Sequence, residues 1–434
     1  MKVLEIPNFS LDILCQLNVQ RYPFLLESVN HNINNRYSIL FAHPQQELVL
    51  ENLTDFNFLD RLSSLNTTNN AQNLHLPFTG GWFAYLSYEL IGQIEPTLLK
   101  DLHNSALPVA IAVKIPCAVV VDHQLEKTYL LDEDDNKTRL NQVLSDIKQA
   151  KLNQVSPDFS GELACETDAK FLSGVEKIKN YIKAGDVFQV NLSRAWKYTL
   201  KNKCSATQLY NALKVSNPAP FSALAQFQNF SIISSSPERL FSVDGTKIET
   251  RPIAGTHPRG VGIEDEVLKQ RLINHPKEQA EHIMLLDLER NDLGRVCEYG
   301  SIEVNEVMTL ETYPYVHHIV SNIKGTLKPS INIKNLVEAL FPGGTITGCP
   351  KIRCMQIISE LEQQAREAYT GSLGYISNNG KMDFNILIRT MIKQDKDLSF
   401  RAGAGIVFDS NPKRELEETT HKAQGILKIF SWLF

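Results

Sequence analysis

The chain has 434 residues, of which 43% are hydrophobic and 21% charged, and its formal net charge is −5. This is the composition of a soluble globular protein with two or three domains or one large α/β unit. It contains no basic stripe, so nucleic acid is not a favoured partner. No apolar run approaches the roughly 18 residues that cross a bilayer, so we expect no membrane partner either.

Cysteine usage and the N-terminus indicate the compartment. The seven cysteines are scattered and contain no C-x-x-C pair, so neither a zinc site nor a disulfide framework is expected. The first residues, Met1–Pro7, lack the long apolar segment of a secretory signal. Together these features predict a protein of the reducing cytoplasm.

Short strands and one helix are predicted in the first third of the chain. Gly80–Tyr88 is a glycine turn that leads into an aromatic strand, and the apolar run Ile115–Val121 predicts a buried strand. Thr138–Ala150 has the apolar spacing of a helix. The polar segment Val155–Leu163 is typical of a linker.

Helices and strands continue to mix after residue 165. Phe171–Ala184 is predicted to be a helix that Gly185 ends, and Asp186–Ser193 a strand. Glu264–Val296 has helical character with Pro276 in its first half. Further helices are predicted at Asn335–Leu340 and Lys351–Arg366, and further strands at Phe230–Ser234, Glu238–Val243, Ser372–Ile376 and Leu398–Val407. Because no regular βαβ rhythm and no internal repeat is visible, we expect an α+β fold with antiparallel sheets.

Two pairs of glutamates are three residues apart on predicted helices: Glu278 with Glu281, and Glu415 with Glu418. This spacing places both carboxylates of a pair on one helix face. With the glycine run at 403–405, two such pairs could form a hard oxygen site for Mg²⁺ with a small anion beside the backbone. The alternative for any single pair is a solvated helix face.

Other segments suggest anion binding. Phe341–Lys351 holds three glycines and two prolines, which favours either a backbone cradle for an anion, with Thr347 and Lys351 as donors, or an ordinary turn-rich loop. Arg389 lies in an apolar run predicted to be a strand, where it would meet a substrate carboxylate or an internal acid. Of His317 and His318, only one can face a site from a strand, and a structural histidine is the alternative.

Taken together, these motifs resemble the chorismate-utilising enzymes. The motifs occur in family order over about residues 170–423: SPER, RPIAGT, EHIMLLDLERNDLGR, VHHIVS, FPGGTITGCPKIR, GSLGY, MDFNILIRT, AGAGIV and ELEETTHKA. The resemblance implies a large antiparallel β-sandwich flanked by helices. It also implies an N-terminal lobe, 1–160, similar to that of anthranilate synthase component I, and a chorismate-binding catalytic domain, 165–434.

The resemblance also implies roles for the site residues. Glu281 and Glu418 would bind Mg²⁺ directly, while Glu278 and Glu415 would hold its waters. The metal would grip the ring carboxylate of chorismate beside Gly403, Ala404 and Gly405. Glu238 would be the general acid for the departing 4-hydroxyl, and His318 would orient the ring. The remaining residues would contact the substrate: Arg389 and Tyr375 at the enolpyruvyl carboxylate, Lys351 and Thr347 near the ring, and the motif Ala254, Gly255 and Thr256 along one edge.

Three branches of the family compete. Asn191 in QVNLS, the segment APFSA and His317 before His318 resemble the aminodeoxychorismate synthase branch. Ala254 stands where many members of that branch carry a lysine nucleophile, and it gives the PIAGT of anthranilate synthases. Ala254 also counts against isochorismate synthase, whose lysine there activates water. A non-catalytic amino-acid-binding subunit is a further alternative, which the intact acids and Arg389 disfavour.

Two partners follow from the resemblance. No G-x-C-x-G glutaminase elbow is present, so ammonia would come from a separate glutamine amidotransferase subunit. The segment LLES resembles one wall of the family's tryptophan pocket. Leu26, Glu27 and Ser28 would form it with Pro218, Pro220 and Phe221, and an apolar core strand is the alternative for LLES.

Overall fold

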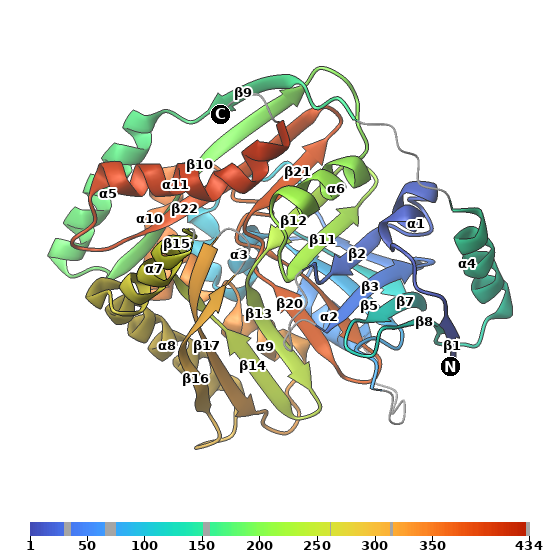
Figure 1. Ribbon diagram of the computed structural model, residues 1–434. Helices are drawn as coiled ribbons and strands as arrows, with labels where there is room; N and C mark the ends of the chain where they lie inside the picture. Colours follow the sequence, from blue (N-terminus) through green and yellow to red (C-terminus); the bar gives the residue numbers. More distant parts are fainter. Residues whose placement is uncertain (30–35, 66–74, 151–156, 261, 313–315, 431–434) are drawn as a thin grey trace.

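The computed structural model describes residues 1–29, 36–65, 75–150, 157–260, 262–312 and 316–430. Two large sheets dominate it, and helices lie over their outer faces (Figure 1). Every strand pair in this part of the chain is antiparallel. The predicted α+β class with antiparallel sheets is therefore confirmed.

The first sheet joins strands from both ends of the chain. Its order is β1 (Lys2–Ile6), β8 (Lys127–Asp132), β7 (Cys117–Asp122), β3 (Tyr37–Ala42), β2 (Phe24–Glu27), β11 (Phe221–Gln226), β12 (Ser231–Ser236), β21 (Thr390–Gln394), β22 (Asp397–Ile406), β10 (Gln189–Leu200) and β18 (Gly348–Cys349), with β9 (Gly161–Cys165) also along β10.

The second sheet is built in the same mixed way. Its order is β15 (Ile253–Pro258), β17 (Val316–Thr326), β14 (Lys247–Arg251), β13 (Arg239–Asp244), β20 (Met382–Asn385), β19 (Ser372–Ser377), β5 (Gly81–Leu86), β6 (Ala110–Ile115) and β4 (Glu47–Leu50), with β16 (Glu303–Thr312) also along β17.

Strands from before residue 160 pair directly with strands from after it in both sheets. Leu25 of β2 lies opposite Leu224 of β11, and Phe83 of β5 lies opposite Tyr375 of β19. The sheets are thus continuous across the proposed division at 160, which stays a prediction. Of the predicted linker 155–163, residues 155 and 156 lie outside the described residues, and Gly161 already begins β9.

Helices cover the outer faces of the sheets. They are α1 (Asp12–Leu17), α2 (Phe58–Leu65), α3 (Ile91–Ile94), α4 (Lys137–Gln149), α5 (Asp168–Ala184), α6 (Ala206–Ser216), α7 (Ile263–Ile273), α8 (Pro276–Val296), α9 (Ile333–Leu340), α10 (Lys351–Glu362) and α11 (Pro412–Leu427). Short 3₁₀ helices are η1 (Tyr88–Leu90), η2 (Pro96–Asp101), η3 (Gly344–Ile346) and η4 (Lys428–Phe430). In the described part of the chain, no helix combines the length and apolar character that a bilayer crossing requires.

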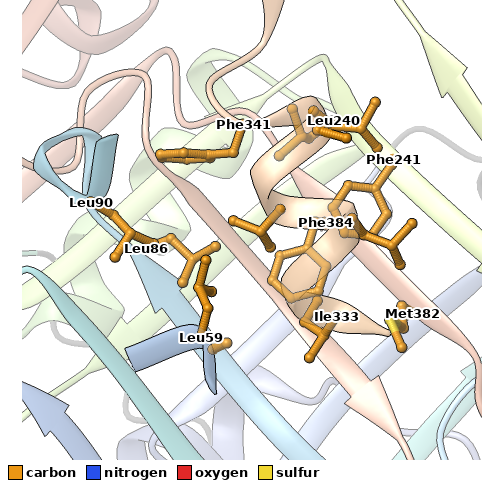
Figure 2. Packing of buried hydrophobic residues seen from close by; sticks show 14 of the residues in the cluster. Leu59, Leu86, Leu90, Leu240, Phe241, Ile333, Phe341, Met382 and Phe384 are labelled. Carbon is orange, nitrogen blue, oxygen red and sulfur yellow. The ribbon is translucent and has the colours of Figure 1, made fainter. Parts of the chain in front are cut away.

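The hydrophobic core has layers between and outside the sheets. Between them, Phe24 of β2 stacks on Phe83 of β5 with ring centroids 4.1 Å apart. Outside the second sheet, Phe241 and Phe384 pack with Ile333 of α9, as Figure 2 shows. Strand β5 is buried along its whole length, which explains its unbroken apolar sequence.

Prolines explain two predictions that are wrong. The segment Glu264–Val296 is two helices rather than one, because Pro276 lacks an N–H and clashes with a preceding turn, and it therefore begins α8. The segment Ile115–Val121 is likewise not one strand. Pro116 separates β6 from β7, and these two strands belong to different sheets.

A third wrong prediction concerns Arg389. It does not lie within a strand but in the segment between β20 and β21, which connects the second sheet to the first. Its backbone has φ of 52°, the left-handed region that a bulky residue rarely adopts. Such strain at a single residue is typical of functional positions.

The chain makes another crossing between the sheets at Glu238, which lies between β12 and β13. The two crossings are hydrogen-bonded to each other. The amide of Ile386 donates to the carbonyl of Glu238 at 3.0 Å, and the amide of Ser235 donates to the carbonyl of Arg389 at 3.2 Å. The fold therefore fixes Glu238 and Arg389 relative to each other.

Candidate active site

A cavity of about 110 Å³ lies beside these two crossings. It is lined by acidic, basic and apolar residues from both sheets, from η3 and from α11. They are Asn191, Pro237, Glu238, Ile253, His318, Thr345, Ile346, Tyr369, Ile388, Arg389, Arg401, Ala402, Gly403 and Lys422. Of the residues that the sequence predicted for a site, Glu238, His318, Arg389 and Gly403 are brought together here.

Glu238 is buried at the cavity wall, with 4% of its surface exposed. Its Oε1 accepts a hydrogen bond from the Thr345 hydroxyl at 2.9 Å and from the Ile253 amide at 3.3 Å. Burial raises the pKa of its carboxyl to about 7, although these donors and the cations Arg389 and Lys422 act in the opposite direction. Near neutral pH a large share of Glu238 therefore carries a proton.

The two adjacent histidines of β17 point to opposite sides, as expected for a strand. His317 is paired with Asp265 at 2.8 Å and does not line the cavity. His318 lines it, and burial followed by the nearby Arg389 lowers its pKa well below the usual value. His318 is therefore a neutral imidazole.

Three cationic side chains reach the cavity. Arg401 of β22 is held by the Ser193 hydroxyl at 2.9 Å and by Glu362 at 3.0 Å. Lys422 of α11 donates to the carbonyl of Gly403 at 3.0 Å and pairs with Glu418 at 2.7 Å. With Arg389, these groups make the cavity suited to an anion.

The glycine run lies on β22, where side chains alternate between faces. Gly403 and Gly405 turn toward the site, whereas the methyl group of Ala404 is buried in the hydrophobic cluster on the other face. A Cβ built on Gly405 would stand only 3.0 Å from Oε1 of Glu281. The bare backbone at 405 thus leaves room for a carboxylate of α8.

The four predicted metal ligands are carboxylates from α8 and α11. Glu281 accepts a hydrogen bond from Gln189 at 2.6 Å. The negative charges of Glu418 and Glu281 both raise the pKa of Lys422. Glu278 approaches Gly255, where a built Cβ would lie 3.0 Å from its Oε2, and Glu415 is buried on α11. Across the described residues, no group of three or more His, Cys, Asp or Glu side chains is assembled around one point as a metal site. The donors nevertheless have the oxygen chemistry that Mg²⁺ prefers.

The predicted polar contacts Thr347, Lys351 and Tyr375 do not line this cavity. Thr347 is buried, and its hydroxyl donates to the carbonyl of Gly343 at 2.9 Å. Lys351 is paired with Asp292 at 2.6 Å outside the lining, and Tyr375 lines a different cavity. Thr345 and Tyr369 line the cavity instead. Thr345 belongs to the same loop that the sequence singled out, whereas the sequence pattern contains no signal for Tyr369.

The motif at 254–256 lies on β15. The side chains of Ala254 and Thr256 lie outside those that the structure describes. Gly255 has φ of +83°, and β15 shifts register against β17 between Ile253 and Thr256. Ile253, at the start of this irregularity, lines the cavity.

A second, larger cavity of about 560 Å³ opens near β2 and β11. Leu26, Glu27, Ser28, Pro220 and Phe221 all line it, whereas Pro218 does not. The two segments predicted to form a tryptophan pocket therefore meet at one cavity. The Glu27 carboxylate accepts hydrogen bonds from the Tyr210 hydroxyl at 2.6 Å and from the Lys214 ammonium at 3.1 Å.

Comparison with known proteins agrees with this arrangement. The sequence profile described as chorismate binding enzyme matches residues 22–428. The chain belongs to the chorismate binding enzyme family. It is 41% identical over 417 residues to an anthranilate synthase component I-like protein of Synechocystis sp., covering 94% of this chain and 85% of the relative.

Two further relatives carry different names. Aminodeoxychorismate synthase component 1 of Bacillus subtilis is 41% identical over 374 residues, covering 83% of this chain and 79% of the relative. The crystal structure of anthranilate synthase component I from Streptococcus pneumoniae matches with a TM-score of 0.81 at 32% identity, covering 92% of this chain and 94% of that one. The resemblance seen in the motifs is confirmed, and the chain is a chorismate-utilising enzyme.

Behind the cavity wall, this chorismate-utilising enzyme buries a second acid. Glu289 of α8 is 6% exposed, and its Oε1 accepts the Gly344 amide at 3.3 Å. Burial and the neighbouring Asp292 raise its pKa to about 7, against the effect of Lys351, and Glu238 raises it further. Because Gly344 precedes Thr345, Glu289 helps to hold the loop that contacts Glu238.

We expect Glu289→Gln to change the pH dependence of stability. A carboxyl whose folded pKa lies above its unfolded value favours folding below the unfolded value and loses that contribution as pH rises through the folded value. Glutamine keeps the acceptor and stays neutral, so from about pH 5 to about pH 8 the variant should gain roughly 1–3 kcal/mol of unfolding free energy relative to the wild type. Urea unfolding at both pH values measures this, with exposed Glu176→Gln as the control. The same difference at both pH values would contradict it.

Proposed function

We propose that this enzyme is an aminodeoxychorismate synthase component I, which converts chorismate and ammonia to 4-amino-4-deoxychorismate and water. The observation that carries the proposal is Glu238, a buried carboxyl with a raised pKa in a cavity that also presents Arg389, Arg401 and Lys422. Chorismate is a dianion, so the cations match its two carboxylates. Hydroxide is a poor leaving group, so an acid beside the 4-hydroxyl is required.

The reaction balances with the groups of the cavity. The lone pair of ammonia forms the new C–N bond, and the C4–O bond breaks with its electron pair on oxygen. Glu238 gives its proton to that oxygen, which leaves as water, and a proton from the new ammonium group restores the Glu238 acid. His318, as a neutral imidazole, orients the ring without adding charge.

The proposal includes Mg²⁺, which the carboxylates of α8 and α11 would hold. Glu281 and Glu418 would bind the ion, and Glu278 and Glu415 would hold its waters. When bound, the ion would neutralise a substrate carboxylate beside the backbone of Gly403 and Gly405. Gln189 orients Glu281 through its 2.6 Å hydrogen bond.

Ammonia would come from a glutamine amidotransferase partner, because component I proteins are by name one part of a larger enzyme. The second cavity would hold tryptophan, since the LLES segment and Pro220–Phe221 line it and its volume of about 560 Å³ accommodates an indole side chain.

Anthranilate synthase component I is the second candidate. Ala254 supports it, because alanine offers no nucleophile for a covalent intermediate, and several relatives carry that name. In that reaction the amine enters at C2 and pyruvate is eliminated. Isochorismate synthase is disfavoured by the same alanine, and a non-catalytic subunit by the intact acids and cations of the cavity.

One assay separates the candidates. The purified chain is incubated with chorismate, Mg²⁺ and excess ammonium near neutral pH, where Glu238 partly keeps its acid form. We expect 4-aminobenzoate to form only after a lyase for aminodeoxychorismate is added, with no fluorescent anthranilate before it. Anthranilate formed without the lyase would establish anthranilate synthase component I. Isochorismate as the product would establish isochorismate synthase. Intact chorismate would indicate a non-catalytic subunit.

The pH profile tests Glu238. At a fixed concentration of free ammonia, kcat/KM for chorismate should fall as pH rises through about 7, because the acid form of Glu238 is lost. Glu238→Gln should lower kcat roughly 100-fold or more and remove this limb. Glu176→Gln, exposed on α5, should leave both unchanged. A wild-type profile that persists in Glu238→Gln would remove Glu238 as the acid.

Gln189→Leu tests Glu281 as a metal ligand without substituting Glu281 itself. The substitution removes the hydrogen bond to Glu281 and should raise the Mg²⁺ concentration for half-maximal rate roughly 10- to 100-fold. Gln149→Leu, at an exposed position of α4, is the matched control. An unchanged Mg²⁺ requirement would argue against Glu281 as a ligand.

A further inference from the structure

The side-chain oxygen of Asn191, on β10, is a buried acceptor at the cavity. The residue is only 8% exposed, yet its Oδ1 is buried and has no hydrogen-bond partner among the described residues. A buried acceptor without a partner is costly, and it is expected to find one in a ligand. The carboxamide lines the cavity together with the proposed substrate groups.

Hydrogen bonds hold the backbone of Asn191 on both sides. Its amide donates to the carbonyl of Thr347 at 2.9 Å, and its carbonyl accepts from Arg366 at 2.8 Å. It also lies opposite Gly405 in the β10–β22 register. The strand therefore fixes the backbone from which the carboxamide enters the cavity.

A second oxygen lies near the same point. A Cβ built on Gly403 would stand 2.6 Å from Oδ1 of Asn191 and 2.7 Å from the hydroxyl oxygen of Tyr369. The missing side chain of Gly403 therefore makes room for two oxygens side by side at the glycine strand. Both are neutral acceptors, in contrast to the cationic donors Arg389, Arg401 and Lys422 of the same cavity.

The chemistry of these groups divides the cavity between two reactants. The cations can only donate hydrogen bonds, which suits the carboxylates of chorismate. Glu238 already accepts from Thr345 and Ile253. Ammonia instead brings three N–H donors and one lone pair, so it needs acceptors that turn the lone pair toward the ring.

Resting on the proposed amination, we infer that Asn191 Oδ1, with the Tyr369 hydroxyl oxygen, accepts N–H bonds from ammonia and positions it for attack. Asn191 is then a residue that selects the nitrogen nucleophile rather than one that binds chorismate. Removing the Asn191 carboxamide affects the ammonia step and leaves the binding of the two chorismate carboxylates unchanged.

Steady-state kinetics with ammonium as the nitrogen source test this. Asn191→Leu, of similar volume but without the acceptor, should raise KM for ammonium roughly 3- to 10-fold and change KM for chorismate less than about 2-fold. Asn191→Asp, which keeps an oxygen acceptor, should restore KM for ammonium toward the wild-type value. Asn202→Ala, on an exposed loop, is the matched control. Thermal unfolding verifies that each variant is folded, and Asn191→Ala, which also lacks the acceptor, replaces Asn191→Leu if the latter is not.

The outcomes separate the inference from the function on which it rests. If the wild type aminates chorismate but the acceptor-free variant keeps its KM for ammonium, the role of Asn191 is overturned and the function stands. A rise confined to KM for chorismate would likewise overturn it, because the carboxamide would then contact the ring substrate. If the wild type consumes no chorismate with ammonium, both are overturned.

Discussion

A single buried carboxylate, Glu362 at the end of α10, holds the candidate active site in place. Its Oε1 accepts from the Ser193 amide, the Ser193 hydroxyl and Arg366, and its Oε2 accepts from Arg366 and Arg401. Arg366 in turn donates to the carbonyls of Ile346 and Asn191. The strand β10, the strand β22 and the loop after α9 are thus tied to one charge. Removing one partner would leave an uncompensated buried ion, which is far more costly than the network is stabilising.

Glu362 and Glu238 show how neighbouring partners give two buried carboxyls opposite properties. Burial alone raises the pKa of both. At Glu362, Arg366, Arg401 and several hydrogen bonds overcome this and lower the pKa to about 2. At Glu238 two hydrogen bonds and more distant cations do not, and the pKa rises to about 7. One acid is therefore a permanent anchor, and the other is poised to exchange a proton near neutral pH.

Much of this organisation could be predicted from the sequence, since periodicity and glycine placement report local structure. The helix that ends at Gly185 and the glycine strand at 403–405 are of this kind. Motif order identified the family, which the profile match bears out. Where Tyr369 and Thr345 enter the cavity could not be predicted, because their positions depend on how distant strands pair. The same limit applies to Tyr375, which lines the second cavity and packs its ring against Phe41 and Phe78 in the inter-sheet core.

The site lies where the chain changes sheets. Glu238 and Arg389 occupy the two crossings that join β12 to β13 and β20 to β21, and each crossing hydrogen-bonds to the other. A residue inside a strand is restricted to one of two faces, whereas a residue at a crossing can direct its side chain into the gap between the sheets. Arg389, at one of these crossings, has a left-handed backbone. Antiparallel strands flank both crossings, and the hydrogen bonds between them hold the two backbones next to each other. Irregular segments supported in this way by regular strands are typical places for functional groups.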